Sequence, residues 1–253
     1  MAYTIAISGK GGTGKTTFAA MVIKHITQRL DKAVLAVDAD PNANLNTALG
    51  VKAGRTIADI RDEVIENKMK LAQTGVSKER LIEYEIQASV QECGKFDLIT
   101  MGRPEGPGCY CYVNNLLRNH LSVLTADFPY VVIDNEAGME HLSRRTTNDV
   151  DVLFVVSEPT VVGIRSAKNV YDLTGSLPIK IKEHSLVLNR VPTAGVHPEI
   201  EKQLKEDGLA VAGRIAHDGE VEEFSITGRP ILELPDTNAA YVAATEIFSK
   251  YLN

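Results

Sequence analysis

A glycine-rich stretch near the beginning of the chain has the composition of a phosphate-binding loop. Residues Gly9-Lys10-Gly11-Gly12-Thr13-Gly14-Lys15-Thr16 match the pattern G-x-x-x-x-G-K-[ST]. Glycines let backbone N–H groups face phosphate oxygens, the lysine neutralises the β- and γ-phosphates, and the threonine hydroxyl binds Mg²⁺. The stretch therefore predicts a site for ATP and Mg²⁺, with Lys15 also acting in catalysis and Thr16 as a metal ligand. The predicted nucleotide-binding residues of the loop are Gly9, Gly11, Gly12, Thr13, Gly14, Lys15, Thr16 and Thr17.

The same glycines also fit the dinucleotide fingerprint G-x-G-x-x-G, and Asp38 ends the next strand as that fingerprint requires. A dinucleotide site, however, has no need of a lysine and a hydroxyl at the beginning of the helix. Lys15 and Thr16 therefore favour a nucleoside triphosphate with Mg²⁺. The dinucleotide site is the alternative.

Carboxylates follow two further apolar stretches. The run 130–134 ends in Asp134, the layout of a Walker B strand, which predicts that Asp134 holds Mg²⁺ through water. Asp38 and Asp40 follow another run, and carboxylates at the C-terminal end of a strand face the ligand crevice of a parallel sheet. A pair of aspartates that only stabilises a turn is the alternative for Asp38 and Asp40.

Two cysteines one residue apart, Cys109 and Cys111, follow a stretch rich in glycine and proline. One chain offers two thiolates, whereas a closed S₄ site needs four, and a symmetric dimer would supply them. Such a site suits Ni²⁺, Zn²⁺, Cu⁺ or an iron–sulfur cluster. Two buried cysteines without a metal are the alternative.

These residues need a scaffold that gathers them, and the hydrophobic pattern supplies one. Apolar, β-branched runs alternate with helical patterns, which predicts an α/β fold with a single doubly wound, mostly parallel sheet and helices on both faces. We expect one P-loop ATPase domain over residues 1–253, with a helical insertion at about 55–93. The expected strands are 3–8, 33–38, 96–100, 130–134, 152–156, 185–189 and 209–215, and the expected helices are 16–30, 113–124, 165–173, 198–206 and 239–252.

Composition narrows the functional classes. The 253 residues carry a net charge of −6 and only three cysteines, which argues against a basic nucleic-acid surface and a disulfide framework. No apolar run is long enough to span a bilayer, and the first residues lack the features of a signal peptide. We expect a cytoplasmic protein that binds neither nucleic acid nor membranes.

The loop K-G-G-x-G-K-T resembles the deviant Walker A motif of the SIMIBI ATPases, which include MinD, ParA, nitrogenase iron protein and ArsA. The resemblance implies that Lys10 reaches the nucleotide of a partner subunit and neutralises charge in the transition state. The stretch Asp38-Ala39-Asp40-Pro41 is similar to switch I of this group. That similarity implies that Asp40 positions the attacking water and that Asp38 lies near Mg²⁺.

Later segments carry the remaining features of this group. Gly138 stands where a switch II loop approaches the γ-phosphate. The resemblance assigns adenine recognition to Asn189, followed by Arg190. It assigns a later adenine and ribose loop to Ala216 and Asp218, although the family often has proline where Ala216 stands.

The stretch G-x-G-C-Y-C, together with the phosphate loop and E-A-G-M-E-H-L, resembles the CooC/AcsF accessory ATPases. These proteins deliver nickel to carbon monoxide dehydrogenase and acetyl-CoA synthase. The resemblance implies an ATP-dependent homodimeric metallochaperone that binds Ni²⁺ or Zn²⁺ at Cys109 and Cys111, with carbon monoxide dehydrogenase/acetyl-CoA synthase as its client.

Two other functions remain open at the level of sequence. An ATP-gated iron–sulfur reductase like nitrogenase iron protein also shares a cluster between subunits, but its cysteines are far apart in sequence. A positioning ATPase of the MinD/ParA type would need a membrane or DNA surface. The C-terminal stretch 243–252 has only Lys250 as a cation, so packing onto the domain is favoured.

Overall fold

Eight strands form one sheet in the computed structural model, which describes residues 2–66, 78–102, 124–136, 149–175 and 180–252. The strand order is β3-β4-β2-β5-β1-β6-β7-β8, and every neighbouring pair is parallel except β3 with β4. The strands are β1 (Tyr3–Ser8), β2 (Val34–Ala39), β3 (Gln91–Glu92), β4 (Phe96–Thr100), β5 (Tyr130–Asn135), β6 (Asp149–Ser157), β7 (Lys180–Val191) and β8 (Val211–Ala216).

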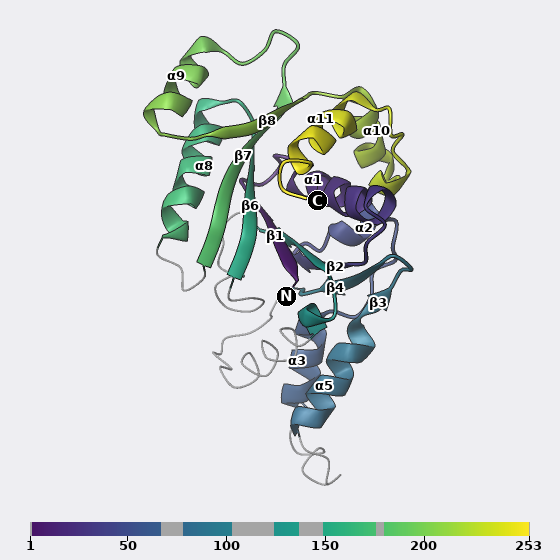
Figure 1. Cartoon of the computed structure of the whole chain (residues 1–253). Coiled ribbons are helices and arrows are strands. Elements are labelled where there is room, and N and C mark those ends of the chain that lie inside the picture. Colours follow the sequence, from purple (N-terminus) through teal and green to yellow (C-terminus); the bar gives the residue numbers. More distant parts are fainter. Residues whose placement is uncertain (1, 67–77, 103–123, 137–148, 176–179, 253) are drawn as a thin grey trace.

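Helices cover both faces of this sheet (Figure 1), which confirms the predicted doubly wound α/β fold. The helices α1, α2 and α11 pack on one face, and α3, α5, α8 and α9 pack on the other. The helical elements are α1 (Lys15–Lys24), η1 (His25–Arg29), α2 (Leu45–Leu49), α3 (Ile57–Glu66), α5 (Lys78–Ser89), α8 (Val161–Thr174), α9 (Pro198–Glu206), α10 (Gly219–Thr227), η2 (Ile231–Glu233) and α11 (Ala239–Phe248).

Some elements differ from the sequence prediction for identifiable reasons. The helix expected to run to residue 30 ends as an α-helix at Lys24 and continues as one turn of π-helix. The sequence missed α10, in which only Phe224 is buried, because one buried residue gives no helical period. It also missed α2, which has only five residues. The helix expected at 113–124 falls almost wholly outside the described residues.

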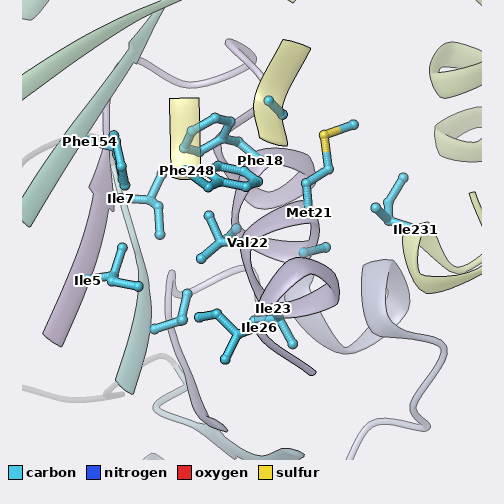
Figure 2. Close-up of a cluster of buried hydrophobic side chains, with 14 of the residues drawn as sticks. Ile5, Ile7, Phe18, Met21, Val22, Ile23, Ile26, Phe154, Ile231 and Phe248 are labelled. Atoms are coloured by element: carbon cyan, nitrogen blue, oxygen red, sulfur yellow. The ribbon is translucent and has the colours of Figure 1, made fainter. Parts of the chain in front are cut away.

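The first helix is anchored by an aromatic cluster beneath the phosphate loop. Phe18 of α1 meets Phe154 of β6 and Phe248 of α11 with ring centroids 5.4 and 5.1 Å apart, both in edge-to-face geometry (Figure 2). Such aromatic pairs add about 0.5–1.5 kcal/mol beyond the burial of their area. This packing fixes the beginning of α1 and therefore the placement of Lys15 and Thr16.

The helices α3 and α5 lie within the stretch expected as an insertion, and they pack under the sheet near β4 (Figure 1). Arg55 makes ion pairs with Glu63 of α3 and Glu85 of α5, and so ties the two helices together. Across the described ranges, no helix is both long and apolar enough to cross a membrane.

Candidate functional site

The phosphate loop connects the central strand β1 to α1, and two of its glycines have conformations that other residues rarely adopt. Gly9 has φ +144°, and a Cβ there would lie 2.1 Å from the carbonyl oxygen of Val156. Gly14 has φ +90°, and a Cβ there would lie 2.5 Å from Nδ2 of Asn189. At Gly9 the loop therefore approaches the backbone of β6 so closely that only glycine fits, and at Gly14 it lies against the Asn189 side chain of β7.

The carbonyl oxygen of Lys10 organises the interior of the loop. It accepts hydrogen bonds from Thr13 Oγ1 at 2.9 Å and from Lys15 Nζ at 3.4 Å. The Lys15 side chain is buried within the curl, whereas Lys10 itself is exposed. The two lysines of the loop thus have different environments, one facing the interior of the site and the other facing outward.

Thr16 and Asp134 meet at the end of β5. The hydroxyl of Thr16 donates a hydrogen bond of 2.6 Å to Oδ2 of Asp134, which is 1% exposed. Oδ1 of Asp134 is buried and has no hydrogen-bond partner. Burial, with the negative charges of Asp38 and Asp40, raises the pKa of Asp134 to about 7, against the opposing effects of Thr16 and Lys15. A hydroxyl beside a buried carboxylate with one unpartnered oxygen fits a Mg²⁺ site.

Asp38 lies directly beside Asp134, since the two residues are in register on β2 and β5. Its carboxylate accepts hydrogen bonds from the backbone N–H of Leu45 at 2.9 Å and of Asp40 at 3.2 Å. Burial raises the pKa of Asp38 to about 6, although these two hydrogen bonds oppose the rise. Asp38 therefore holds the following loop in shape, and its proposed nearness to Mg²⁺ is consistent with its place beside Asp134.

Asp40 lies in the loop that Asp38 organises. Its Oδ1 accepts hydrogen bonds from the backbone N–H of Asn42 at 2.8 Å and from the Asn42 side chain at 2.9 Å. Asp40 lines the same cavity as Lys15 and Thr16. The structure thus brings three of the predicted polar groups to one cavity.

A second cavity continues from the first and is lined by the ends of β7 and β8. Asn189 Nδ2 donates a hydrogen bond of 2.8 Å to the carbonyl oxygen of Thr13. Arg190 has the unusual φ of +53°, and its guanidinium binds the carbonyl oxygen of Gly12 at 2.8 Å and Glu158 at 3.1 Å. Gly14, Thr17, Arg190 and Ser225 line both cavities, so one groove runs from the phosphate loop to the second cavity.

The far wall of the second cavity includes Ala216 and Asp218. Asp218 caps α10, since its Oδ1 accepts hydrogen bonds of 3.0 Å from the backbone N–H of Glu220 and Val221. Burial tends to raise the pKa of Asp218, but these hydrogen bonds and one from Asn238 outweigh it and hold the pKa below its ordinary value. The carboxylate is therefore occupied in capping the helix.

Three predicted site residues lie outside the described residues, namely Gly138, Cys109 and Cys111. In the described part of the chain, no group of three or more His, Cys, Asp or Glu side chains could hold a metal ion. The predicted nickel site is therefore untested by the structure.

Sequence reasoning missed some residues of the groove. Glu158 pairs with Arg190, and Val221 and Met21 line the second cavity. No motif marks them, because they reach the groove from separate strands and helices. Only Glu158 carried a signal in the sequence, since it follows the strand expected at 152–156.

The fold and the groove together define a P-loop nucleotide-binding protein. A glycine-rich loop joins the central strand to a helix, and the groove lies at the C-terminal edge of the parallel strands. Residues 4–231 match the family described as the CobQ/CobB/MinD/ParA nucleotide binding domain, and the chain belongs to this family.

Two relatives support this assignment, and a solved structure shares the fold. An uncharacterized ATP-binding protein of Methanocaldococcus jannaschii is 40% identical, with 98% of both chains covered. The carbon monoxide dehydrogenase accessory protein CooC of Rhodospirillum rubrum is 36% identical, with 70% of both chains covered. The septum site-determining protein MinD of Pyrococcus horikoshii, solved with Mg-ADP, has a TM-score of 0.68 at 18% identity and covers 99% of this chain and 96% of that one.

Proposed function

We propose that the protein is a Mg²⁺-dependent ATPase. The observation that carries this proposal is the contact between Thr16 and Asp134 at the mouth of the phosphate loop, with one Asp134 oxygen left unpartnered. In this proposal Thr16 and Asp134 hold Mg²⁺, with Asp38 beside them. When bound, the ion supplies positive charge that offsets the charge of the β- and γ-phosphates.

The residues of the chain account for the remaining steps of hydrolysis. The backbone N–H groups of the loop and the ammonium of Lys15 bind the phosphates. The Asp40 carboxylate orients a water molecule toward the γ-phosphate, and phosphoryl transfer depends mainly on such positioning. Lys10 is exposed, so it is free to reach the nucleotide of a partner subunit.

The second cavity is proposed to hold the base. Because Nδ2 of Asn189 is engaged with Thr13, the amide oxygen is left to accept a hydrogen bond from the amino group of adenine. Asp218 is occupied as a helix cap and does not offer a free carboxylate to guanine. These two arrangements favour ATP over GTP.

We further propose that the ATPase acts as a homodimeric metallochaperone that delivers nickel to carbon monoxide dehydrogenase/acetyl-CoA synthase. The similarity to CooC over 70% of the chain and the sequence Cys109-Tyr110-Cys111 support this proposal. Two chains would bring four thiolates together around one Ni²⁺ or Zn²⁺.

Hydrolysis is tested by steady-state turnover of ATP with and without Mg²⁺. We expect Lys15→Gln to abolish turnover, because the phosphates lose their buried cation. Lys205→Gln, an exposed lysine of α9, is the matched control and should behave as the unmodified protein. Turnover that persists in Lys15→Gln would contradict the proposed ATPase site.

The metal binding that delivery requires is tested separately by titrating the reduced apo protein with Ni²⁺ and with Zn²⁺, with and without Mg-ATP. The expected result is one metal per dimer, lost in the variant Cys109→Ser/Cys111→Ser and retained in the control Cys93→Ser. An unchanged metal stoichiometry in the double variant would overturn the chaperone proposal and leave the ATPase proposal standing.

A further inference from the structure

The end of β4 links the nucleotide groove to the helix α3. The backbone N–H of Met101 donates a hydrogen bond of 2.8 Å to the carbonyl oxygen of Asp38. The carbonyl oxygen of Met101 accepts one of 2.9 Å from the N–H of Ala58, in the first turn of α3. A single residue therefore separates α3 from the aspartate beside the proposed Mg²⁺ site.

Packing reinforces these hydrogen bonds. Ile57 and Ile60 of α3 belong to the same buried cluster as Val37 and Ala39, the two residues that flank Asp38. Met101, which is 2% exposed, also belongs to this cluster. Since close-packed interiors transmit displacement, a shift of α3 would move the end of β2.

Gly102 packs closely against Thr56 where the end of β4 meets the beginning of α3. It has φ +71°, and a Cβ there would lie 2.5 Å from Oγ1 and 2.7 Å from Cβ of Thr56. Thr56 begins α3 with a reciprocal cap, since its Oγ1 accepts from Asp59 N at 3.1 Å and its N–H donates to Asp59 Oδ2 at 2.8 Å. Thr56 is therefore held by α3 on one side and confined by Gly102 on the other.

On the groove side, hydrogen bonds connect Asp38 to the loop that carries Asp40. Its carboxylate holds the N–H groups of Asp40 and Leu45, which bracket this loop. The path from α3 to Asp40 thus consists of Ala58, Met101 and Asp38, each joined to the next by a hydrogen bond.

We propose that Met101 and Gly102 are positioning residues through which α3 sets the Asp40 loop, so that the placement of α3 and the nucleotide site are coupled. The inference rests on the proposed hydrolysis of ATP, in which Asp40 orients water. Coupling of this kind is reciprocal in binding, so nucleotide must also act on α3.

The test compares Gly102→Ala with Gly94→Ala. Both glycines are left-handed and flank β4, but a Cβ at Gly94 (φ +85°) meets nothing within 4 Å. The two variants share the backbone strain and differ in the collision with Thr56. We expect Gly102→Ala to lower kcat at least fivefold, with KM for ATP within twofold, while Gly94→Ala keeps both values.

A second variant, Ala58→Pro, tests the same link by a different change, so the proposal can still be tested if Gly102→Ala does not fold. Ala58→Pro removes the N–H that binds Met101, at a position in the first helical turn where the N–H has no partner within the helix. It should lower kcat in the same way. Unchanged kcat in folded Gly102→Ala and Ala58→Pro would overturn the proposal.

Hydrogen exchange in the unmodified protein gives a readout that does not depend on hydrolysis. Mg-ADP should slow exchange of the Ala58 and Met101 amides severalfold, and Gly102→Ala should lose this effect while still binding Mg-ADP. If the exchange rates of these two amides are the same with and without Mg-ADP, the proposed coupling is refuted. Failure of the unmodified protein to hydrolyse ATP would instead refute the ATPase proposal.

Discussion

Two buried carboxylates lie side by side at the centre of the groove, and their electrostatics govern how it responds to pH. Asp38 and Asp134 are neighbours on β2 and β5, and both are almost fully buried. Burial is the main cause of the raised pKa of each. A bound divalent cation would favour the ionised forms, so metal binding and proton release are linked at this site.

The affinity for Mg-nucleotide should therefore depend on pH through Asp134. Since its pKa is raised to about 7, raising the pH from 6 to 8 ionises the carboxylate and should tighten binding about tenfold. Calorimetric titration with Mg-ADP at several pH values measures this. The control Asp134→Asn should bind weakly with a much smaller pH dependence, and equal pH dependence in both proteins would contradict the assignment.

The same carboxylate should influence the stability of the metal-free protein with the opposite sign. Its pKa is raised from 3.8 in the unfolded chain to about 7 in the folded one, so the folded state binds more protons between these values. This contribution to stability is present below pH 3.8 and is lost as the pH rises through 7. Urea unfolding measures the free energy of unfolding at each pH. From pH 5 to pH 8 the unmodified protein should lose stability relative to Asp134→Asn. A difference that stays constant over this range would argue against the raised pKa.

At the scale of elements, the placement of the phosphate loop depends on the packing of α1 against β6 and α11. Phe18, Phe154 and Phe248 come from three distant segments and meet edge to face (Figure 2). None of these rings carries out chemistry. Their contribution is to fix the helix that bears Lys15 and Thr16.

Phe248→Ala should therefore destabilise the fold by about 3–5 kcal/mol, because it removes a fully buried ring and leaves a cavity. Chemical denaturation measures the loss. Val242→Ala, on the same helix but 42% exposed, should change stability by less than about 0.5 kcal/mol. Similar losses in the two variants would show that the cluster does not anchor α11.

At the scale of the whole molecule, the proposed mechanism requires two copies of the chain. Lys10 in the phosphate loop is exposed, while Lys15 at the beginning of α1 is buried. In the proposed mechanism Lys15 acts on the nucleotide of its own chain, and the exposed Lys10 acts on the nucleotide of the partner.

We expect Mg-ATP to shift the protein from 27.5 kDa to twice that mass in sedimentation experiments. Lys10→Ala should bind ATP but lower turnover about a thousandfold, as loss of a trans-acting cation does in other nucleotide hydrolases. Lys52→Ala, another exposed lysine, is the control. Full turnover by Lys10→Ala, or by a protein that stays monomeric, would contradict the dimeric mechanism.

The sequence by itself determined the class of fold and the identity of the phosphate loop. Buried strands such as 152–156 are continuous apolar runs, and the loop pattern is local, so both are readable without coordinates. The division into one domain, the cysteine metal site and the roles of Lys10 and Gly138 stay predictions.

Only the tertiary structure showed that Asp38 braces a loop, that Glu158 pairs with Arg190, and that Met101 links Asp38 to α3. Each of these contacts joins two different elements, or joins a strand to the loop that follows it. None of them follows from a periodic pattern in the sequence. Neighbouring strands bring residues far apart in the chain to one edge of the sheet, and which groups meet there follows from strand order and register, which no local pattern specifies.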